Sequence, residues 1–216
     1  MEIDASDKRA TMSVGEFASF SPYAKREESK GLGAWRAAVG QQWHQEVQSH
    51  ADSEGFENEQ SISGEISWHG WKLQLKGRID QIRVQNNELH AREIKTVSGH
   101  LPLDRDSIAQ KYKDYCLQLL SYRELLQRSK RYPFDSFRIE LYLIEFSTGI
   151  TQSFILDASF DHLIVDQLDR VTDYLDQKRE RLEKLRSLKF KSAYATPRQG
   201  QETIQSDLKS AFNRSR

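Results

Sequence analysis

The chain has 216 residues, of which 37% are hydrophobic and 30% are charged, and its 32 basic and 32 acidic residues give a formal net charge of zero at pH 7. This length suffices for one buried core, whereas no apolar run of about 18 residues that could span a membrane occurs and the first residues lack the apolar stretch of a secretion signal. The single cysteine, Cys116, excludes an internal disulfide and any four-cysteine zinc or iron–sulfur site. We therefore expect a cytoplasmic protein with no membrane association and no iron–sulfur cluster.

The first sixty residues contain one predicted helix. Residues 1–30 show little periodicity and are predicted to be a loosely ordered amino-terminal segment. Residues 31–50 carry apolar side chains every three or four positions, which predicts a helix. The polar stretch 49–60 is predicted to be a loop.

From residue 61 the hydrophobic period changes to two, which is typical of β-strands. Strands are predicted over 61–68, 71–84 and 88–96. The first turn is His69-Gly70, and the second is Gln85-Asn86-Asn87, where Asn tolerates the positive φ that tight hairpins need. These segments predict an antiparallel meander of three strands.

The second half of the chain predicts two long helices around a pair of strands. The helices are expected over 103–129 and 160–190, and the strands over 137–146 and 151–156. Together these elements predict an α/β fold with a mixed central β-sheet of about five strands flanked by helices. The domain would cover 31–190 and leave a basic carboxyl-terminal tail over 191–216.

The basic residues concentrate near the carboxyl terminus. From Lys178 onward there are eleven Lys or Arg residues but only four Asp or Glu residues. A neutral total charge neither favours nor excludes a nucleic-acid partner, because one groove can be basic on a neutral protein. A solvated helix and tail is the simpler interpretation of most of these charges.

Three charged side chains of the predicted hairpin suggest a site for a divalent cation. Asp80 precedes the centre of the second turn by about as many residues as Glu93 follows it, so the two carboxylates are predicted to lie opposite each other. Cross-strand neighbours have Cβ atoms about 5 Å apart, which lets two carboxylates share one cation. Lys95 is two residues beyond Glu93, hence on the same face of its strand. Two carboxylates and an amine suit metal-dependent hydrolysis of a phosphodiester.

An acidic residue two positions before a lysine is a weak signal alone. The pattern occurs four times, at 28–30, 93–95, 176–178 and 207–209. Only the 93–95 copy lies on a predicted strand that follows an Asp-bearing strand. For such a pattern taken by itself, a surface hairpin with cross-strand charges is the alternative interpretation.

Several motifs in a fixed order strengthen the nuclease interpretation. They are His44 in the first helix, Gly77-Arg78-Ile79-Asp80, Arg92-Glu93-Ile94-Lys95-Thr96, and Gln118 with Tyr122 in the following helix. In these motifs the chain resembles the PD-(D/E)XK nucleases, specifically the RecB-like exonuclease branch, over roughly residues 31–156. The cysteines that hold an iron–sulfur cluster in some relatives are absent.

The resemblance implies a restriction-endonuclease-like core and a role for each motif residue. Asp80 and Glu93 would bind Mg²⁺ or Mn²⁺, with His44 and the Ile94 carbonyl as further ligands. Lys95 would assist the activation of water. The residues expected to contact DNA are Gln118, Tyr122 and Arg78.

The residues themselves leave two of these roles open. Gln118 and Tyr122 are four positions apart and share a helix face, but Tyr122 also belongs to the apolar seam of its helix and could be a core residue. His44 could equally be a structural histidine. Because Mg²⁺ seldom takes imidazole, a His ligand would favour tolerance of Mn²⁺.

Three functions remain compatible with the sequence. The first is a metal-dependent DNA nuclease, which the resemblance suggests to be an exonuclease acting on single strands or DNA ends. The second is a non-catalytic nucleic-acid-binding or assembly subunit that docks on a helicase or recombination protein through the basic segment after Lys178. The third is an unrelated α/β domain with a fortuitous hairpin. A motor within the chain is not expected, because no Gly-x₄-Gly-Lys-Ser/Thr loop is present.

Overall fold

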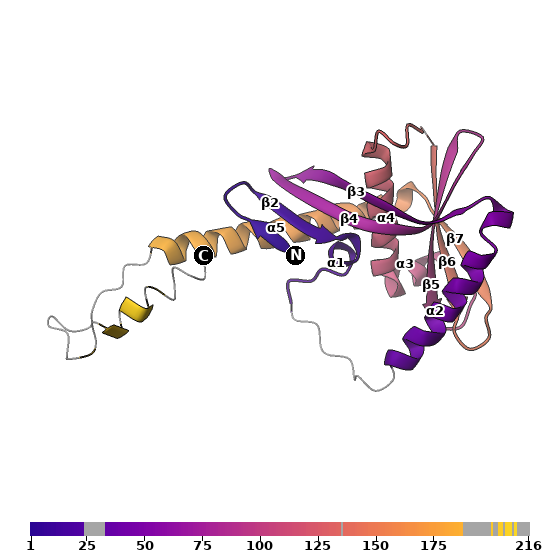
Figure 1. The fold of residues 1–216 in the computed structure, drawn as a ribbon, viewed down its shortest axis with the longest axis horizontal. Coiled ribbons are helices and arrows are strands. Elements are labelled where there is room, and N and C mark those ends of the chain that lie inside the picture. The colour runs from indigo at the N-terminus through magenta and orange to yellow at the C-terminus, as the bar shows by residue number, and fades with distance from the viewer. Residues whose placement is uncertain are drawn as a thin grey trace. The chain divides into compact units, whose positions relative to one another are not determined.

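The computed structural model describes residues 1–23, 33–134 and 136–187, and a few positions between 200 and 210. Contacts divide the chain into two units, Met1–Gln177 and Lys178–Arg216. The first unit holds the β-sheet and most of the helices (Figure 1). Most of the predicted tail over 191–216 lies outside the described residues.

Within the described residues, seven strands form one sheet in the order β1-β2-β4-β5-β6-β7, with β3 paired to β4 beside this path. β2–β4 and β5–β6 are parallel, and the other pairs are antiparallel. The predicted mixed sheet is therefore confirmed. The strands are β1 (Glu2–Asp4), β2 (Arg9–Ser13), β3 (Glu57–Trp68), β4 (Trp71–Gln85), β5 (Glu88–Val97), β6 (Ser136–Glu145) and β7 (Thr151–Leu156).

The helices pack against this sheet, so that the fold is the predicted α/β arrangement. α4 contacts α1, β3, β5 and β6, and α2 contacts β5 (Figure 1). The helices are α1 (Val14–Ala18), α2 (Gly33–Ser49), α3 (Arg105–Lys111), α4 (Lys113–Arg128) and α5 (Asp161–Ser187), with short 3₁₀ turns η1 (Asp52–Glu54) and η2 (Ala158–Phe160).

The amino-terminal segment differs from the prediction. Residues 1–30 were expected to be loosely ordered, but Glu2–Ala18 forms β1, β2 and α1, which explains why the sheet exceeds five strands. Ser13 and Glu16 form a capping box at the start of α1. Phe17 of α1 is fully buried. These elements are too short to show a period in sequence, and their order depends on contacts with distant residues.

Two further boundaries differ from the prediction. The expected loop over 49–60 contains η1 and the start of β3 at Glu57. The expected single helix over 103–129 is broken at Tyr112, whose φ of −122° and ψ of 35° interrupt the helical backbone between α3 and α4. An apolar period that continues across such a break cannot reveal it.

Both predicted hairpin turns are confirmed. His69 and Gly70 have φ of 46° and 78°, and Asn86 and Asn87 have φ of 52° and 62°. Positive φ at both central residues is the geometry of a two-residue type I′ turn. The β3–β4–β5 meander therefore forms as expected.

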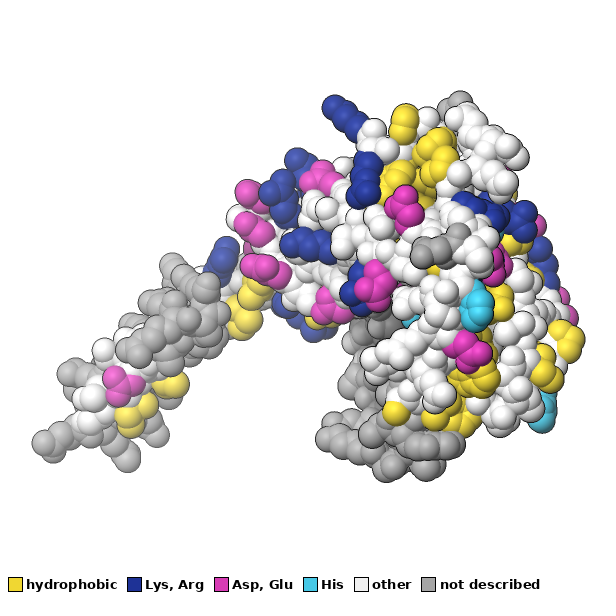
Figure 2. Space-filling model, turned by 45° about the vertical axis from the view of Figure 1, so that its right-hand side comes forward, with side chains coloured by type: hydrophobic (Ala, Val, Ile, Leu, Met, Phe, Trp, Pro, Cys, Tyr) yellow, Lys and Arg dark blue, Asp and Glu magenta, His cyan; other side chains and the backbone are white. Residues whose placement is uncertain are grey.

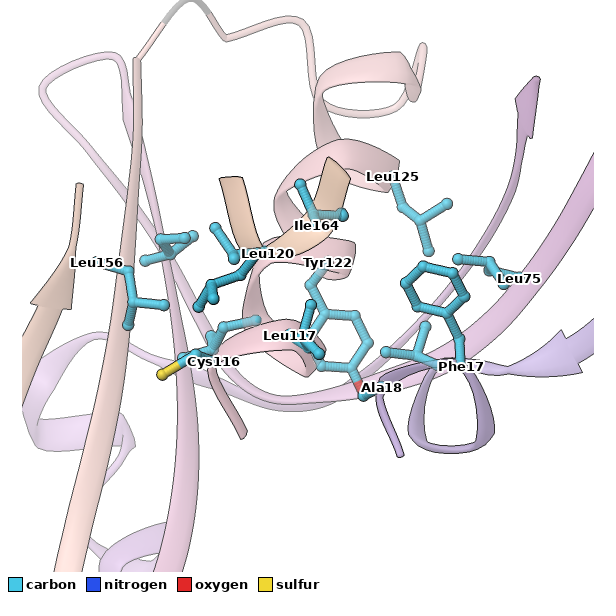
Figure 3. Packing of buried hydrophobic residues seen from close by; sticks show 14 of the residues in the cluster. Phe17, Ala18, Leu75, Cys116, Leu117, Leu120, Tyr122, Leu125, Leu156 and Ile164 are labelled. Carbon is cyan, nitrogen blue, oxygen red and sulfur yellow. The ribbon is translucent and has the colours of Figure 1, made fainter. Parts of the chain in front are cut away.

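The hydrophobic core lies between the sheet and α4. Leu117 and Leu125 of α4 are buried on the side of Leu75 of β4 and Phe17 of α1, whereas Leu120 of α4 lies toward Leu156 of β7 (Figure 3). α5 completes this core with Leu163, Ile164, Leu168, Val171 and Leu175. Cys116 is a free, buried cysteine within it.

Candidate active site

The site forms where the pairing of β4 changes partner. β3 pairs with one edge of β4 from Trp71 to Ile82. β2 pairs with residues 72–76 of β4 and β5 with residues 81–85. Because β3 occupies one edge, β2 and β5 both use the other, and no described strand pairs with that edge between Gly77 and Asp80. Backbone groups exposed there need other partners.

Tyr122 of α4 supplies one of these partners. Its hydroxyl donates a hydrogen bond of 2.9 Å to the Arg78 carbonyl oxygen. A Cβ at Gly77 would lie 2.6 Å from Tyr122 Cε1, so only glycine admits the ring this close. The ring lies in the core (Figure 3) and is 2% exposed, and burial raises the pKa of its hydroxyl. In this conformation Tyr122 supports β4 and is too buried for the expected contact with DNA.

Asp80, at the same unpaired stretch of β4, provides a hydrogen-bond acceptor for a backbone N–H of β5. Its Oδ2 accepts a hydrogen bond of 2.8 Å from the Ile94 N–H, just beyond the last ladder pair, Gln81 with Arg92. On the other edge of β4, Glu59 has a positive φ of 56° and interrupts the β3–β4 register opposite Asp80. The Asp80 carboxylate thus crosses to β5 at the position of the predicted motif.

Glu93 is the buried member of the cluster, with 1% exposure. Its Oε1 accepts hydrogen bonds of 2.6 Å from both Lys95 Nζ and Gln118 Nε2. Its Oε2 is buried and has no hydrogen-bond partner among the described residues. Burial raises the pKa of Glu93 to about 7, because the loss of hydration outweighs the attraction of the Lys95 ammonium.

Lys95 stays cationic beside this carboxylate. Burial alone would lower its pKa, but the charge of Glu93 and the hydrogen bond to it raise the pKa overall. The Nζ atom also lies 5.4 Å from the ring centroid of Tyr115, in cation–π geometry. The amine is therefore placed at Glu93, as the motif predicts.

His44 reaches the cluster from α2. Its Nε2 lies 3.0 Å from Asp80 Oδ2, and this hydrogen bond raises the pKa of the imidazole. Trp43 holds the same helix in place, because its Nε1 donates to the Phe146 carbonyl oxygen at 3.4 Å and its ring lies against Gly149.

An open pocket of about 300 Å³ lies beside Asp80. Its wall includes His44 and the exposed Arg78, whose Nη1 lies 3.2 Å from Glu59 Oε2. Arg78 is therefore accessible to a ligand, in contrast to Tyr122. The polar side chains that line the pocket are Gln41, His44, Gln45, Gln48, Glu59, Arg78 and Asp80.

The donor set fits a hard divalent cation held by few protein ligands. Among the residues that the structure describes, no three His, Cys, Asp or Glu side chains converge as a metal site. Mg²⁺ commonly binds through one or two carboxylates and keeps its remaining positions for water and phosphate oxygens. Asp80 and the unpartnered Oε2 of Glu93 match that pattern. The roles of His44 and the Ile94 carbonyl as ligands stay predictions.

Sequence reasoning missed two neighbours of the motif. Tyr115 lies three positions before Gln118 on α4, and this spacing could have placed it on the same face. Glu59 lies far upstream in a stretch predicted to be a loop. No sequence signal links Glu59 to Arg78, because the β3–β4 register brings them together.

Comparison with protein families finds a match over most of the chain. The sequence profile described as the PD-(D/E)XK nuclease superfamily matches residues 5–207. The chain belongs to this superfamily. Members of the PD-(D/E)XK superfamily generally use divalent metals such as Mg²⁺. The match also includes β2 and α1, which the sequence-based domain boundary at residue 31 left out.

Two of the solved structures that the chain matches are described as a candidate exonuclease and a phage-related exonuclease. A candidate exonuclease from Eubacterium rectale is 10% identical, with 88% of this chain and 92% of that protein covered and a TM-score of 0.49. A phage-related exonuclease from Haemophilus somnus 129PT is 12% identical, with 80% and 96% covered and a TM-score of 0.40. None of the curated proteins matches significantly. The superfamily assignment therefore depends on the sequence profile.

None of the described helices combines the length and the apolar character that a membrane crossing requires.

Proposed function

We propose that this PD-(D/E)XK protein is a divalent-metal-dependent deoxyribonuclease of the RecB-like kind, which hydrolyses phosphodiester bonds in single strands or at DNA ends. One observation supports the proposal above the others. A buried carboxylate, Glu93, has one oxygen bonded to an ammonium and the other without a described partner, beside the second carboxylate of the motif. Burying a carboxylate oxygen without a partner lowers the stability of the protein. Such groups with shifted pKa values are typical of functional sites, where a ligand supplies the partner.

Asp80 and Glu93 would hold Mg²⁺ or Mn²⁺, which when bound neutralises charge on the scissile phosphate and makes water more acidic. Gln118 orients Glu93 by donating to its Oε1. Lys95 keeps a positive charge next to this carboxylate and can donate to a phosphate oxygen or orient water. His44, bonded to Asp80, would restrict its rotation or serve as a further ligand.

DNA would approach through exposed groups around the pocket. Arg78 is exposed and lines it, so it can exchange its contact with Glu59 for one with a phosphate. On the face shown in Figure 2, acidic and basic side chains are mixed rather than gathered into a single basic patch. We expect DNA ends or single strands as the substrate from the RecB-like resemblance.

The second candidate is a non-catalytic subunit that docks on a helicase or recombination protein. One observation favours it: Leu182 and Leu185 are exposed on the basic end of α5, at 37% and 42%. This segment could bind a partner whether or not the site is catalytic. The two candidates differ in their dependence on Asp80 and Lys95.

Cleavage of labelled single-stranded and double-stranded DNA, with Mg²⁺ or Mn²⁺, tests the proposal. We expect Asp80→Asn, Glu93→Gln and Lys95→Ala each to lower the cleavage rate at least about 10²-fold, the usual contribution of a positioned catalytic group. Lys72→Ala, which removes an exposed lysine elsewhere on β4, is the matched control and should cut normally.

The proposed binding of a divalent cation by Asp80 and Glu93 is tested by titrating Mn²⁺ calorimetrically into the wild type and into Asp80→Asn. We expect binding to wild type that is lost in the variant. Equal cleavage by wild type and all three site variants would refute the nuclease assignment. A wild type that binds DNA but never cuts it would favour the non-catalytic candidate.

A further inference from the structure

A second pocket, of about 350 Å³, opens at the carboxyl end of β5. Ser98 and Gly99 form part of its wall, and Lys111, Tyr112 and Tyr115 form another part. Its volume lies near the lower end of the range of about 300–1,000 Å³ that is typical of small-molecule sites. Of the motif residues named above, Thr96 alone lines this pocket, at the end of the Glu93–Lys95 strand.

Two tyrosines give the pocket a flat aromatic wall. The rings of Tyr112 and Tyr115 are parallel, with centroids 5.5 Å apart and an angle of 4° between their planes. Tyr112 is placed there by the break between α3 and α4. Both side chains are only half-buried, so a further planar group can stack on them.

The pocket shares this wall with the active site. Lys95 Nζ lies over the ring of Tyr115, 5.4 Å from its centroid. Tyr115 thus contacts the motif lysine and also stacks on Tyr112. A group that stacks on Tyr112 would therefore be joined to Lys95 through Tyr115.

Lys111 adds a positive charge at the mouth of the pocket. Its side chain is exposed, and its Nζ lies 5.9 Å from the Tyr112 ring centroid. Within the described part of the chain no carboxylate forms an ion pair with it. Gly99 leaves room for the amine, since a Cβ there would lie 2.9 Å from Lys111 Nζ. The ammonium is thus available to a phosphate.

We propose that this pocket binds the nucleotide next to the scissile phosphate in a single strand, with its base stacked on Tyr112 and its phosphate paired with Lys111. The inference rests on the proposed nuclease function and extends it to the substrate. An unpaired base has a free face for stacking, whereas a base inside a duplex is already stacked on both sides. The pocket therefore favours single strands or frayed ends.

An abasic-site scan tests this subsite. Oligonucleotides that lack one base, at successive positions around the cut, are cleaved by wild type with subsaturating enzyme. We expect one position at which the missing base slows wild type about 5- to 150-fold, the range for one base–aromatic stack. Tyr112→Leu should cut intact DNA more slowly by a similar factor and lose sensitivity to that missing base. Tyr112→Phe should behave like wild type.

A charge comparison tests the phosphate contact. Lys111→Gln should weaken cleavage and reduce its salt dependence, because about one phosphate contact is lost. Lys130→Gln removes an exposed lysine beyond the opposite end of α4 and should do neither. Thermal unfolding of each variant shows whether the fold is retained.

The outcomes separate the two proposals. If wild type does not cut any DNA, the proposed function fails. If wild type cuts but no abasic position slows it, or if Tyr112→Leu and the abasic site slow cleavage independently, the function stands and the subsite is wrong. A Tyr112→Leu protein that is unfolded leaves the decision to the wild-type scan and to Lys111→Gln.

Discussion

Gly77 controls how closely α4 approaches β4, the strand that carries Asp80. An added Cβ would lie 2.6 Å from Tyr122 Cε1 and 3.0 Å from Val14 Cγ2, and both side chains are buried. Overpacking of this kind costs about 1–3 kcal/mol. We expect Gly77→Ala to lose that much unfolding free energy in urea and to lower activity, because Tyr122 supports β4 two residues from Asp80.

Gly15→Ala is the matched control for this change. A Cβ at Gly15 meets nothing within 4 Å, and the residue lies in α1. Alanine in a helix is favoured over glycine by up to about 1 kcal/mol, so this variant should be as stable as wild type or slightly more so. If Gly77→Ala were equally stable, the close approach of Tyr122 would not require glycine.

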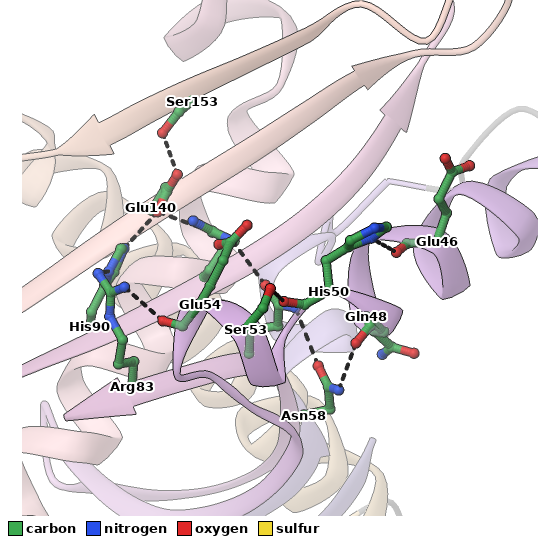
Figure 4. Close-up of polar contacts among 12 residues, drawn as sticks. Glu46, Gln48, His50, Ser53, Glu54, Asn58, Arg83, His90, Glu140 and Ser153 are labelled. Atoms are coloured by element: carbon green, nitrogen blue, oxygen red, sulfur yellow. Dashed lines mark hydrogen bonds and ion pairs between the residues drawn. The ribbon is translucent and has the colours of Figure 1, made fainter.

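At the scale of elements, a buried polar network joins β5, β6 and β7 (Figure 4). Glu140 of β6 accepts hydrogen bonds from Arg92 Nε at 3.1 Å and from Ser153, and its Oε2 lies 2.6 Å from His90 Nε2. Its side chain is 4% exposed. Burial would raise the pKa of Glu140, but the hydrogen bonds from His90 and Ser153 and the charge of Arg92 lower it to about 2.

This network predicts a specific dependence of stability on pH. Because the pKa of folded Glu140 lies below the ordinary value of 4.5, its ionised form stabilises the protein above about pH 4.5, and this contribution is lost as pH falls towards 2. Removing one partner of a buried ion pair costs about 3–5 kcal/mol. We expect Glu140→Gln to cost about 3 kcal/mol at pH 7 and clearly less at pH 3, measured by urea unfolding.

Glu88→Gln provides the control on the same strand pair. Glu88 lies at one end of the β5–β6 ladder, whereas Glu140 lies near its middle, and Glu88 accepts a hydrogen bond from Ser136. It is only half-buried, so its replacement should change stability by about 0.5 kcal/mol or less. A cost of Glu140→Gln that stayed the same at pH 7 and pH 3 would contradict the assigned role of its charge.

At the scale of the whole molecule, the core and the basic segment belong to different units. All core residues of α5 precede Lys178, where the second unit begins. Several basic side chains at the end of α5 are exposed, namely Lys178, Arg181, Lys184 and Arg186. Stability and charge-dependent binding should therefore be separable by mutation. The predicted domain boundary at 190 stays a prediction, since residues 188–199 lie outside the described part.

Replacing Lys178, Arg181 and Lys184 together by Gln tests whether this segment follows the DNA backbone. The melting temperature should not change. Each phosphate contact to a single strand contributes about 0.7 to the slope of log affinity against log salt, so we expect the slope to fall by up to about 2. The same change at the exposed residues Lys72, Lys76 and Lys130 serves as the control. Equal slopes for the two triple variants would exclude a specific role for α5.

The sequence alone predicted the elements whose pattern is local. The β3–β4–β5 meander followed from a period of two and from turn residues that accept positive φ, namely Gly70, Asn86 and Asn87. Asp80 was predicted to lie next to the strand of Glu93, because the two residues are about equally far from the turn at Asn86 and Asn87. The position of Lys95 on the same strand face as Glu93 followed from the alternation of side chains along a strand.

Tertiary structure decided what depends on distant partners. β2 is a strand because β4 offers it an edge, and that edge is left unpaired at the candidate active site, between the residues that pair with β2 and those that pair with β5. Tyr122 is a buried support because Gly77 lets its ring reach the Arg78 carbonyl. Spacing within one segment specifies which side chains share a face, but burial and hydrogen-bond partners depend on which other segments pack against that face.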